Sequence, residues 1–273
     1  MCLAILASNV LPDWPLIVLA NRDELHSRPT LAASPWSDAE TILAGRDLSA
    51  GGTWLGITTQ GRVALLTNYR EPGHHDPLAP SRGQLTDGFL RGDDSPHSYA
   101  QSLRDRGNRY NGFNLMLADT TGLLYCSNRG HEKIQPLDKG VMGISNASLN
   151  TPWPKLTRTQ RAVSKHLAQV GERGAPNAGL LFDIMQDTRT ASIDELPDTG
   201  VGPDREKLLS SPFIKNERYG TRCTTLILRR ADGMVRFQEK RFDAQGLIVG
   251  ESLWTVDTLQ QRFLSGTEET FNF

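Results

Sequence analysis

Cys2 is the residue best suited to chemistry, because it directly follows the initiator methionine. Removal of Met1 generally requires a small second residue, and cysteine meets that requirement. The shortened chain would carry a thiol and a free α-amine on one residue. The amine, with an ordinary pKa near ~7.7, could take the thiol proton and leave a nucleophilic thiolate. The competing interpretation is that a small apolar cysteine merely begins a buried strand.

A second candidate group is the tetrapeptide NRDE at residues 21–24, which directly follows the apolar run 16–20. A strand that ends in such a group places charge at the edge of a sheet. Arg22 beside carboxylates could hold a thiolate or an amine through paired hydrogen bonds. The competing interpretation is a solvated loop with a surface ion pair, which contributes little energy.

Other chemistry-bearing residues favour simpler interpretations. The sequence GGTW at 51–54 lacks the Gly-Lys-Ser/Thr ending of a phosphate loop, so we expect a tight turn with Trp54 in the core or in a pocket wall. Adjacent histidines are poor joint metal ligands, so residues 74–76 (HHD) are predicted to form a solvated loop and no metal site. Cys126 and Cys223 alternate with apolar neighbours and are predicted to be buried thiols.

The composition excludes several classes of protein. With 30 Lys+Arg against 31 Asp+Glu the formal net charge is −1, so we expect no nucleic-acid partner. Three cysteines without a C-x-x-C pair give neither a disulfide framework nor a zinc ribbon. The apolar runs near the N-terminus stop at polar residues or proline, so no signal peptide or membrane span is predicted. We therefore expect a soluble cytoplasmic protein without integral membrane association.

The elements that must position these residues follow from apolar runs and turn signals. Tight hairpins indicate antiparallel pairing, and strands gather at both ends of the chain with helices between them, so the predicted fold class is α+β in one domain over residues 1–273. Gly61 supplies the positive φ of one hairpin turn, and Ser95-Pro96 begins a helix. The predicted strands are 3–7, 16–20, 53–58, 62–67, 113–118, 123–127, 140–145, 224–229 and 234–242, and the predicted helices are 81–90, 96–104, 154–170 and 180–186.

A set of motifs in a fixed order makes the chain resemble a known family. They are the Cys2 start, NRDE at 21–24, AGGTWLG at 50–56, TNYR at 67–70, YNGFNL at 110–115, SN at 145–146, TPWPK at 151–155 and YGTR at 219–222. They resemble the NRDE family, which is the family of transport and Golgi organisation protein 2. The resemblance implies similarity to the N-terminal nucleophile hydrolases, whose fold is a four-layer αββα sandwich of two antiparallel sheets flanked by helices.

Within that superfamily the chain is similar to the cysteine branch of penicillin V acylases and bile salt hydrolases. The resemblance implies that Cys2 is the nucleophile and that Asn68 donates a hydrogen bond to the tetrahedral oxyanion. It implies that Asn146 is a second polar residue lining the site and that Arg222 is a supporting arginine near the nucleophile.

The NRDE motif departs from the pattern of these hydrolases, which place arginine and aspartate three residues apart. Here Arg22 and Asp23 are adjacent, and Glu24 follows. We predict that Arg22 and Asp23 orient the thiol and the amine, with Glu24 as the competing carboxylate. Adjacent residues on an extended backbone point to opposite faces, so one of the pair could be structural.

Two functions from different classes remain open. The first is an amidohydrolase or acylase that acts on a small-molecule amide or acyl substrate and requires no cofactor. The second is a non-catalytic protein that binds or transports haem or a lipid metabolite on the same scaffold, with Cys2 or a nearby histidine available as an iron ligand. The substrate, the choice between hydrolysis and acyl transfer, and the oligomeric state are open.

Overall fold

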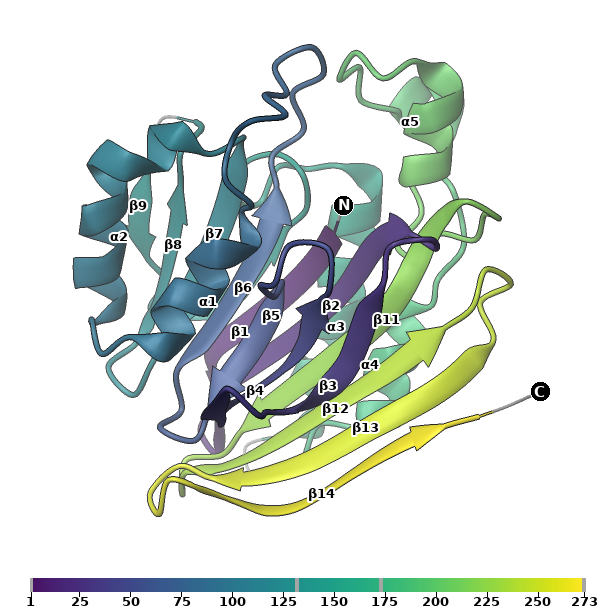
Figure 1. Cartoon of the computed structure of the whole chain (residues 1–273). Coiled ribbons are helices and arrows are strands. Elements are labelled where there is room, and N and C mark those ends of the chain that lie inside the picture. The colour runs from purple at the N-terminus through teal and green to yellow at the C-terminus, as the bar shows by residue number, and fades with distance from the viewer. Residues whose placement is uncertain (1, 131–132, 172–173, 272–273) are drawn as a thin grey trace.

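The computed structural model describes residues 2–130, 133–171 and 174–271, and two seven-stranded antiparallel sheets form its centre (Figure 1). The first sheet has the order β10-β1-β2-β11-β12-β13-β14, and its strands are β1 (Cys2–Leu11), β2 (Trp14–Leu25), β10 (Gly140–Ile144), β11 (Tyr219–Arg229), β12 (Met234–Phe242), β13 (Ile248–Asp257) and β14 (Arg262–Thr270). The second sheet follows chain order from β3 to β9, and its strands are β3 (Thr30–Trp36), β4 (Ala39–Asp47), β5 (Leu55–Thr58), β6 (Val63–Asn68), β7 (Phe113–Ala118), β8 (Leu123–Ser127) and β9 (Ile134–Pro136).

Helices cover the outer face of each sheet, as Figure 1 shows. α1 (Gly83–Arg91) and α2 (Pro96–Arg106) pack on the second sheet, whereas α3 (Pro154–Val170) and α4 (Ala178–Met185) pack on the first. The short helix α5 (Pro203–Leu209) and two 3₁₀ turns, Gly107–Arg109 and Ile193–Glu195, complete the helical segments of the described residues. The Ser95 side chain accepts a hydrogen bond from the backbone N–H of Ser98, so the predicted start of α2 is confirmed.

Strand β1 shows how the layers are held together. Ala4 and Leu6 point into the apolar core between the sheets, whereas Leu3, Ile5 and Ala7 point into the core beneath α3 and α4. Both faces of the strand are buried, and for this reason its sequence is a continuous apolar run instead of an alternating one. Apolar contacts on both faces of both sheets make a helix–sheet–sheet–helix stack, so the predicted four-layer αββα sandwich is confirmed.

Several elements were not predicted. The hairpin of β3 and β4 was missed because Pro35 interrupts the β3 pattern, and α5 because it has only seven residues. β14 is exposed except at the half-buried Phe263, so it carries no apolar alternation that could have identified it. The predicted end of β2 at residue 20 was wrong: the strand continues to Leu25 and contains the whole NRDE motif.

The part of the chain that the structure describes contains neither a membrane-spanning helix nor a cluster of metal-ligating side chains. None of its helices combines the length and the apolar character needed to cross a bilayer. In the same residues, no three His, Cys, Asp or Glu side chains come together in a way that could hold a metal ion.

Candidate active site

Four of the six predicted site residues line one cavity of about 320 Å³ beside the first residues of β1: Cys2, Arg22, Asp23 and Asn68. They come from the first residue of β1, from β2 of the same sheet and from the last residue of β6 in the other sheet. Sequence-distant groups are therefore brought to the same end of the sandwich. Their catalytic roles remain predictions, and Met1, whose removal the chemistry requires, lies outside the described residues.

A β-bulge sets the positions of the NRDE side chains. Cys2 lies directly opposite Arg22 across the β1–β2 ladder. On the other side of β2, Arg22 pairs with Cys223 and Asp23 pairs with Thr221, so Arg222 is an extra residue in β11. Bulges of this kind increase local twist and redirect side chains, and they occur next to active sites.

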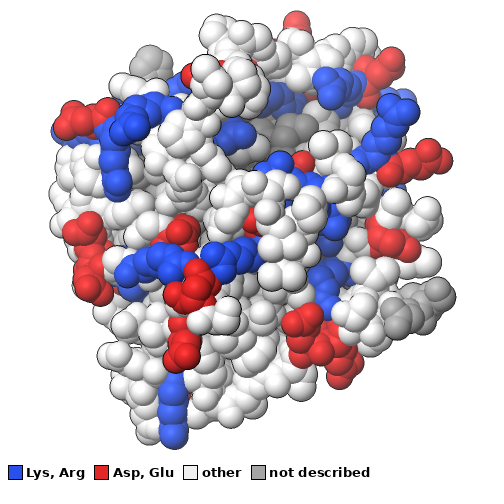
Figure 2. All heavy atoms as spheres, in the orientation of Figure 1, with Lys and Arg blue, Asp and Glu red and all other residues white. Residues whose placement is uncertain are grey.

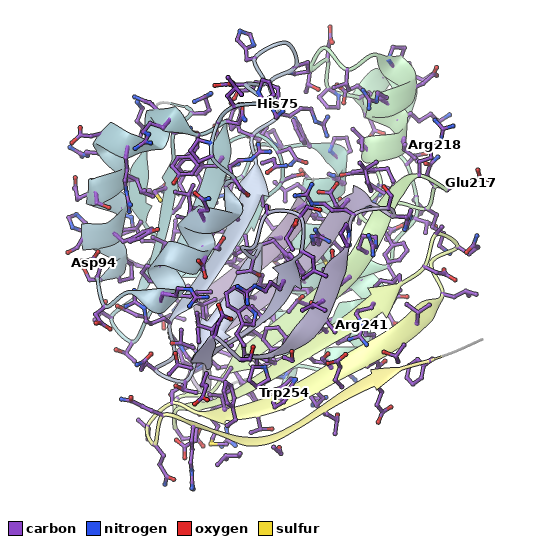
Figure 3. The ribbon with its side chains drawn as sticks, in the orientation of Figure 1. His75, Asp94, Glu217, Arg218, Arg241 and Trp254 are labelled. Carbon is purple, nitrogen blue, oxygen red and sulfur yellow. The ribbon has the colours of Figure 1, made fainter. Side chains whose placement is uncertain are left out.

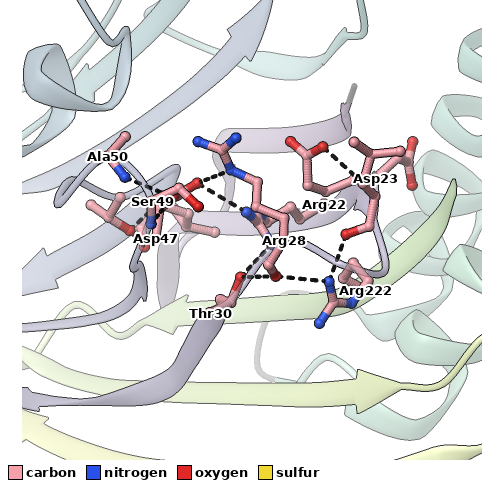
Figure 4. Close-up of polar contacts among 12 residues, drawn as sticks. Arg22, Asp23, Arg28, Thr30, Asp47, Ser49, Ala50 and Arg222 are labelled. Atoms are coloured by element: carbon pink, nitrogen blue, oxygen red, sulfur yellow. Dashed lines mark hydrogen bonds and ion pairs between the residues drawn. The ribbon is translucent and has the colours of Figure 1, made fainter. Parts of the chain in front are cut away.

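Arg22 points into the space between the two sheets and braces a wall of the cavity (Figure 4). Its guanidinium lies 4.1 Å from the centroid of the Trp54 ring, and Nη1 donates to Thr30 Oγ1 at 3.1 Å. Nη2 is 3.3 Å from Asp47 Oδ2, which also accepts a 2.6 Å bond from Arg28 Nε. Trp54 is therefore both a core residue and a pocket wall, and Arg22 holds that wall in place.

Asp23 points to the opposite side of the sheet, toward α3. Its side chain is 1% exposed, and Thr221 Oγ1 donates a 2.7 Å hydrogen bond to Oδ1. Burial raises the pKa of Asp23, and the nearby Lys155 cation acts against that rise. Arg22 and Asp23 therefore point to opposite faces of the sheet, as expected for adjacent residues on an extended backbone. Arg22 lies on the side that faces the other sheet.

Cys2 is half-buried, and opposing effects act on its thiol. Burial and the Asp23 carboxylate raise the pKa of Cys2, whereas the Arg22 cation and a hydrogen bond from the backbone N–H of Asp23 lower it. The Ser145 hydroxyl donates to the carbonyl oxygen of Cys2 at 3.1 Å, which fixes the backbone at this point. The net effect is a raised pKa, so the thiol lines the cavity with Arg22 as the nearby group that favours its ionised form.

Asn68 and Asn146 have different environments. Asn68 lines the cavity at the end of β6. Asn146 is fully buried and is not among the described residues that line the cavity; its Nδ2 donates a 2.8 Å bond to the main-chain carbonyl of Asn68. The carbonyl of Asn146 also accepts a 2.7 Å bond from the backbone N–H of Arg70. Asn146 therefore positions the segment that carries Asn68.

Arg222 also lies outside the described lining of the cavity. Its Nη1 donates to the main-chain carbonyls of Leu25, His26 and Arg28, at 2.8, 3.1 and 3.2 Å (Figure 4). These bonds stabilise the turn after β2, which carries Arg28 to the cavity. Arg222 therefore contacts the turn and not the cavity, and its supporting role near the nucleophile remains a prediction.

Glu24, the competing carboxylate, also lines the cavity. It is only partly buried, and its Oε1 accepts a 2.8 Å bond from the backbone N–H of the following residue, Leu25. Asp23 is instead fully buried, and its charge and its backbone N–H both act on the Cys2 thiol. The choice between the two carboxylates remains a prediction.

Two cations close to Cys2 were missed by the sequence analysis. Arg82 lines the cavity; its Nη1 donates to the Gly112 carbonyl at 3.1 Å, and the charge of Cys2 acts on its guanidinium. Lys155 is 1% exposed and lies behind Asp23. Lys155 and Thr159 share one helical face by their i, i+4 spacing, a signal that could have placed Lys155 against the sheet.

A close main-chain approach shapes the wall on which Arg82 sits. A side chain at Gly52 would meet the carbonyl oxygen of Gly83 at 2.5 Å, so only glycine allows the loop after β4 to pack on the start of α1. His75 and Asp76 line the rim of the cavity and are exposed (His75 is labelled in Figure 3). The predicted loop at 74–76 therefore borders the site.

The charges around this site are mixed in sign. Three arginines and four acidic residues line the cavity: Arg22, Arg28, Arg82, Asp23, Glu24, Asp47 and Asp76. Figure 2 shows blue and red side chains interspersed on the visible face, without a large area of one sign. A mixed surface of this kind gives no basis for binding a polyanion.

Comparisons with known proteins identify the family. The family model described as Transport and Golgi organisation 2 matches residues 1–244. The human Transport and Golgi organization protein 2 homolog is 38% identical over 242 residues, covering 83% of this chain and 86% of that protein. The Drosophila melanogaster Transport and Golgi organization protein 2 is 32% identical over 261 residues, covering 88% and 92%.

Two solved structures are distantly similar to this chain. A variant of the conjugated bile acid hydrolase from Clostridium perfringens has a TM-score of 0.48 at 9% identity, over 100% of this chain and 97% of that one. A Caenorhabditis elegans N-acylethanolamine-hydrolyzing acid amidase ortholog has a TM-score of 0.45 at 11% identity, over 83% and 92%. Scores this low carry no conclusion about activity. The family-model match along the chain and the identities to the curated relatives show that this protein belongs to the Transport and Golgi organisation 2 family.

Proposed function

We propose that this protein is a cysteine N-terminal nucleophile hydrolase that cleaves a small amide after removal of Met1. The observation that carries the proposal is that Cys2, Arg22, Asp23 and Asn68 line one cavity. A thiol, a buried carboxylate and a side-chain amide donor are the groups that acyl transfer requires.

The reaction would begin with transfer of the Cys2 thiol proton to the α-amine of the same residue. The thiolate then attacks the substrate carbonyl carbon, and the carbonyl π electrons move to oxygen. The Asn68 side-chain amide and a backbone N–H would hold this oxyanion. Collapse of the intermediate expels the amine product, which takes the proton from the ammonium. Water then hydrolyses the thioester and releases the acid.

The substrate that this cavity supports is small and polar. Charged residues outnumber the large apolar ones, Trp54 and Leu66, in its lining, and its volume of about 320 Å³ is near the lower end for small-molecule sites. Sites for long acyl chains need a continuous apolar surface. A small amide with polar substituents is therefore the substrate class that we propose.

The haem-binding alternative has one supporting observation: His75 lines the same cavity as Cys2, so an imidazole and a thiol are both present. The rest of the lining does not fit a porphyrin, whose large apolar faces need apolar walls, and we derive no step through haem. Titration of the purified protein with haem separates the alternatives. A Soret shift that both Cys2→Ser and His75→Ala remove would favour the alternative.

The test of the hydrolase proposal is formation of an acyl-enzyme. Protein without Met1 is incubated with p-nitrophenyl acetate, and the adduct is located by peptide mass spectrometry. We expect acetylation at Cys2 that hydroxylamine reverses when it is added to the folded protein, before the acyl group can move from sulfur to the α-amine, with none in Cys2→Ser and normal labelling in Cys126→Ser. Release of amine from a panel of small N-acyl amino acids then identifies the substrate. Labelling that persists in Cys2→Ser would contradict the proposal.

A further inference from the structure

Lys155 is a buried cation that takes no part in the bond-making and bond-breaking steps of the proposed reaction. It is the second residue of α3 and follows Trp153 and Pro154 in the TPWPK motif. Its side chain is 1% exposed, and among the described residues no hydrogen-bond partner lies within reach of Nζ. Burying an ammonium group without close partners costs free energy, so we expect the charge of Lys155 to have a function at this position.

The charges that act on Lys155 come from three elements and one loop. Asp23 on β2 is the dominant one, followed by Arg70 after β6, Cys2 on β1 and Glu206 on α5. Burial lowers the pKa of Lys155 to about 8, while Asp23 acts to keep it charged. The influence is mutual, since Lys155 is the largest charge effect that opposes the rise in the pKa of Asp23.

The other carboxylate near Lys155 already has a cation of its own. Glu206 Oε2 accepts a 2.8 Å bond from Arg70 Nη1, and Oε1 accepts bonds from the backbone and hydroxyl of Thr199. The phenol of Tyr219 donates a 2.9 Å bond to the Asp23 carbonyl from the β11 side, and burial raises the pKa of that phenol, so Tyr219 adds no charge. Lys155 is therefore positioned to act on Asp23.

We propose that Lys155 is a positioning residue, whose charge keeps the Asp23 carboxylate ionised so that it can hold the α-amine of Cys2. The proposal rests on the proposed function, because the amine becomes available only when Met1 is removed. In the proton transfer, the S–H bond of Cys2 breaks and an N–H bond forms on the amine. The carboxylate stabilises the resulting ammonium, and the ammonium stabilises the thiolate. This indirect effect opposes the direct repulsion by which the Asp23 carboxylate raises the pKa of Cys2, and the proposal requires it to be the larger of the two.

The experiment measures the rate of Cys2 alkylation by iodoacetamide as a function of pH, with the modified peptide quantified by mass spectrometry. Lys155→Met keeps the length of the side chain and removes its charge. We expect the midpoint of the profile to move upward by about one pH unit, which makes alkylation near neutral pH about tenfold slower. Asp23→Asn and the double variant Asp23→Asn/Lys155→Met complete a double-mutant cycle.

If Lys155 acts through Asp23, the same lysine substitution shifts the midpoint much less in the Asp23→Asn background. Equal shifts in both backgrounds, or no shift in either, would overturn the proposal. If Lys155→Met alone does not fold, the comparison of the double variant with Asp23→Asn decides: matching profiles support the proposal and distinct profiles overturn it. Retention of Met1, or slow alkylation of wild-type Cys2, overturns both this proposal and the hydrolase proposal.

Discussion

The side-chain amide of Asn146 donates a 2.8 Å hydrogen bond to the main-chain carbonyl of Asn68. Asn146 follows β10, at the edge of one sheet, whereas Asn68 ends β6 in the other sheet. This bond therefore joins the two sheets beside the cavity. It fixes the backbone from which the Asn68 side chain reaches the position proposed for the oxyanion.

Asn146→Ala is expected to lower the free energy of unfolding by about 1–3 kcal/mol, because it leaves the partly buried Asn68 carbonyl without this donor. Asn68→Ala is expected to change stability by less than about 1 kcal/mol but to lower kcat on the order of 10²–10³-fold once a substrate is known. Urea unfolding and steady-state kinetics measure the two effects. Equal losses of stability in the two variants would contradict the assigned roles.

Arg82 is expected to attract anionic reagents to Cys2, because its guanidinium lines the same cavity and interacts with the charge of that residue. The ratio of Cys2 alkylation rates with iodoacetate and iodoacetamide measures this preference. Arg82→Gln is expected to lower the ratio several-fold, on the order of 1 kcal/mol. Arg104→Gln, which removes an exposed guanidinium on α2, is the matched control. An unchanged ratio in Arg82→Gln would show that Arg82 does not act on ligands.

Much of this fold could be predicted because the buried strands and helices carry strong local patterns. The predicted helix at 154–170 and strand at 234–242 have the bounds observed for α3 and β12. By contrast, β14 is exposed except at Phe263, and it is held mainly by backbone pairing with β13, a relationship that leaves no apolar pattern in the sequence.

The candidate site could be predicted only where a motif preserved it. The sequence indicated Cys2, Arg22 and Asp23, but adjacency alone could not decide which face each side chain takes, because a bulge opposite them sets the local twist. The relationship between Lys155 and Asp23 joins residues far apart in the chain. It depends on how α3 packs on the first sheet, which no local pattern specifies.

The ion pair between Arg70 and Glu206 is expected to contribute strongly to stability, since both side chains are almost fully buried, at 6% and 4% exposure. Arg70→Met is expected to cost about 3–5 kcal/mol, because it leaves the Glu206 carboxylate buried without its cation. Arg70→Met/Glu206→Gln removes both charges and is expected to recover part of that loss. Denaturant unfolding at neutral pH measures both variants. A cost below about 1 kcal/mol for the single variant would contradict the assignment.

Glu239 is expected to make stability depend on pH. It is 2% exposed, accepts bonds from the Ala33 backbone N–H and the Thr225 hydroxyl, and burial raises its pKa. Because the folded state favours the protonated acid, its contribution is fully present below the ordinary pKa of about 4.3 and is lost as pH rises through the raised folded-state value. Glu239→Gln cannot ionise, so unfolding curves across this range should show a weaker decline with pH. Identical declines in both proteins would contradict the assignment.

The central claim is tested most directly by the state and reactivity of Cys2 in the purified protein. Intact-mass analysis reports whether Met1 is removed, and peptide mapping after brief iodoacetamide treatment compares the three thiols. Burial raises the pKa of Cys126 to about 12 and that of Cys223 well above its usual value, so both should react slowly. We predict a chain without Met1 in which Cys2 is labelled at least about tenfold faster than the other two. A chain that keeps Met1, or a Cys2 that reacts no faster than Cys126 and Cys223, would contradict a nucleophilic role.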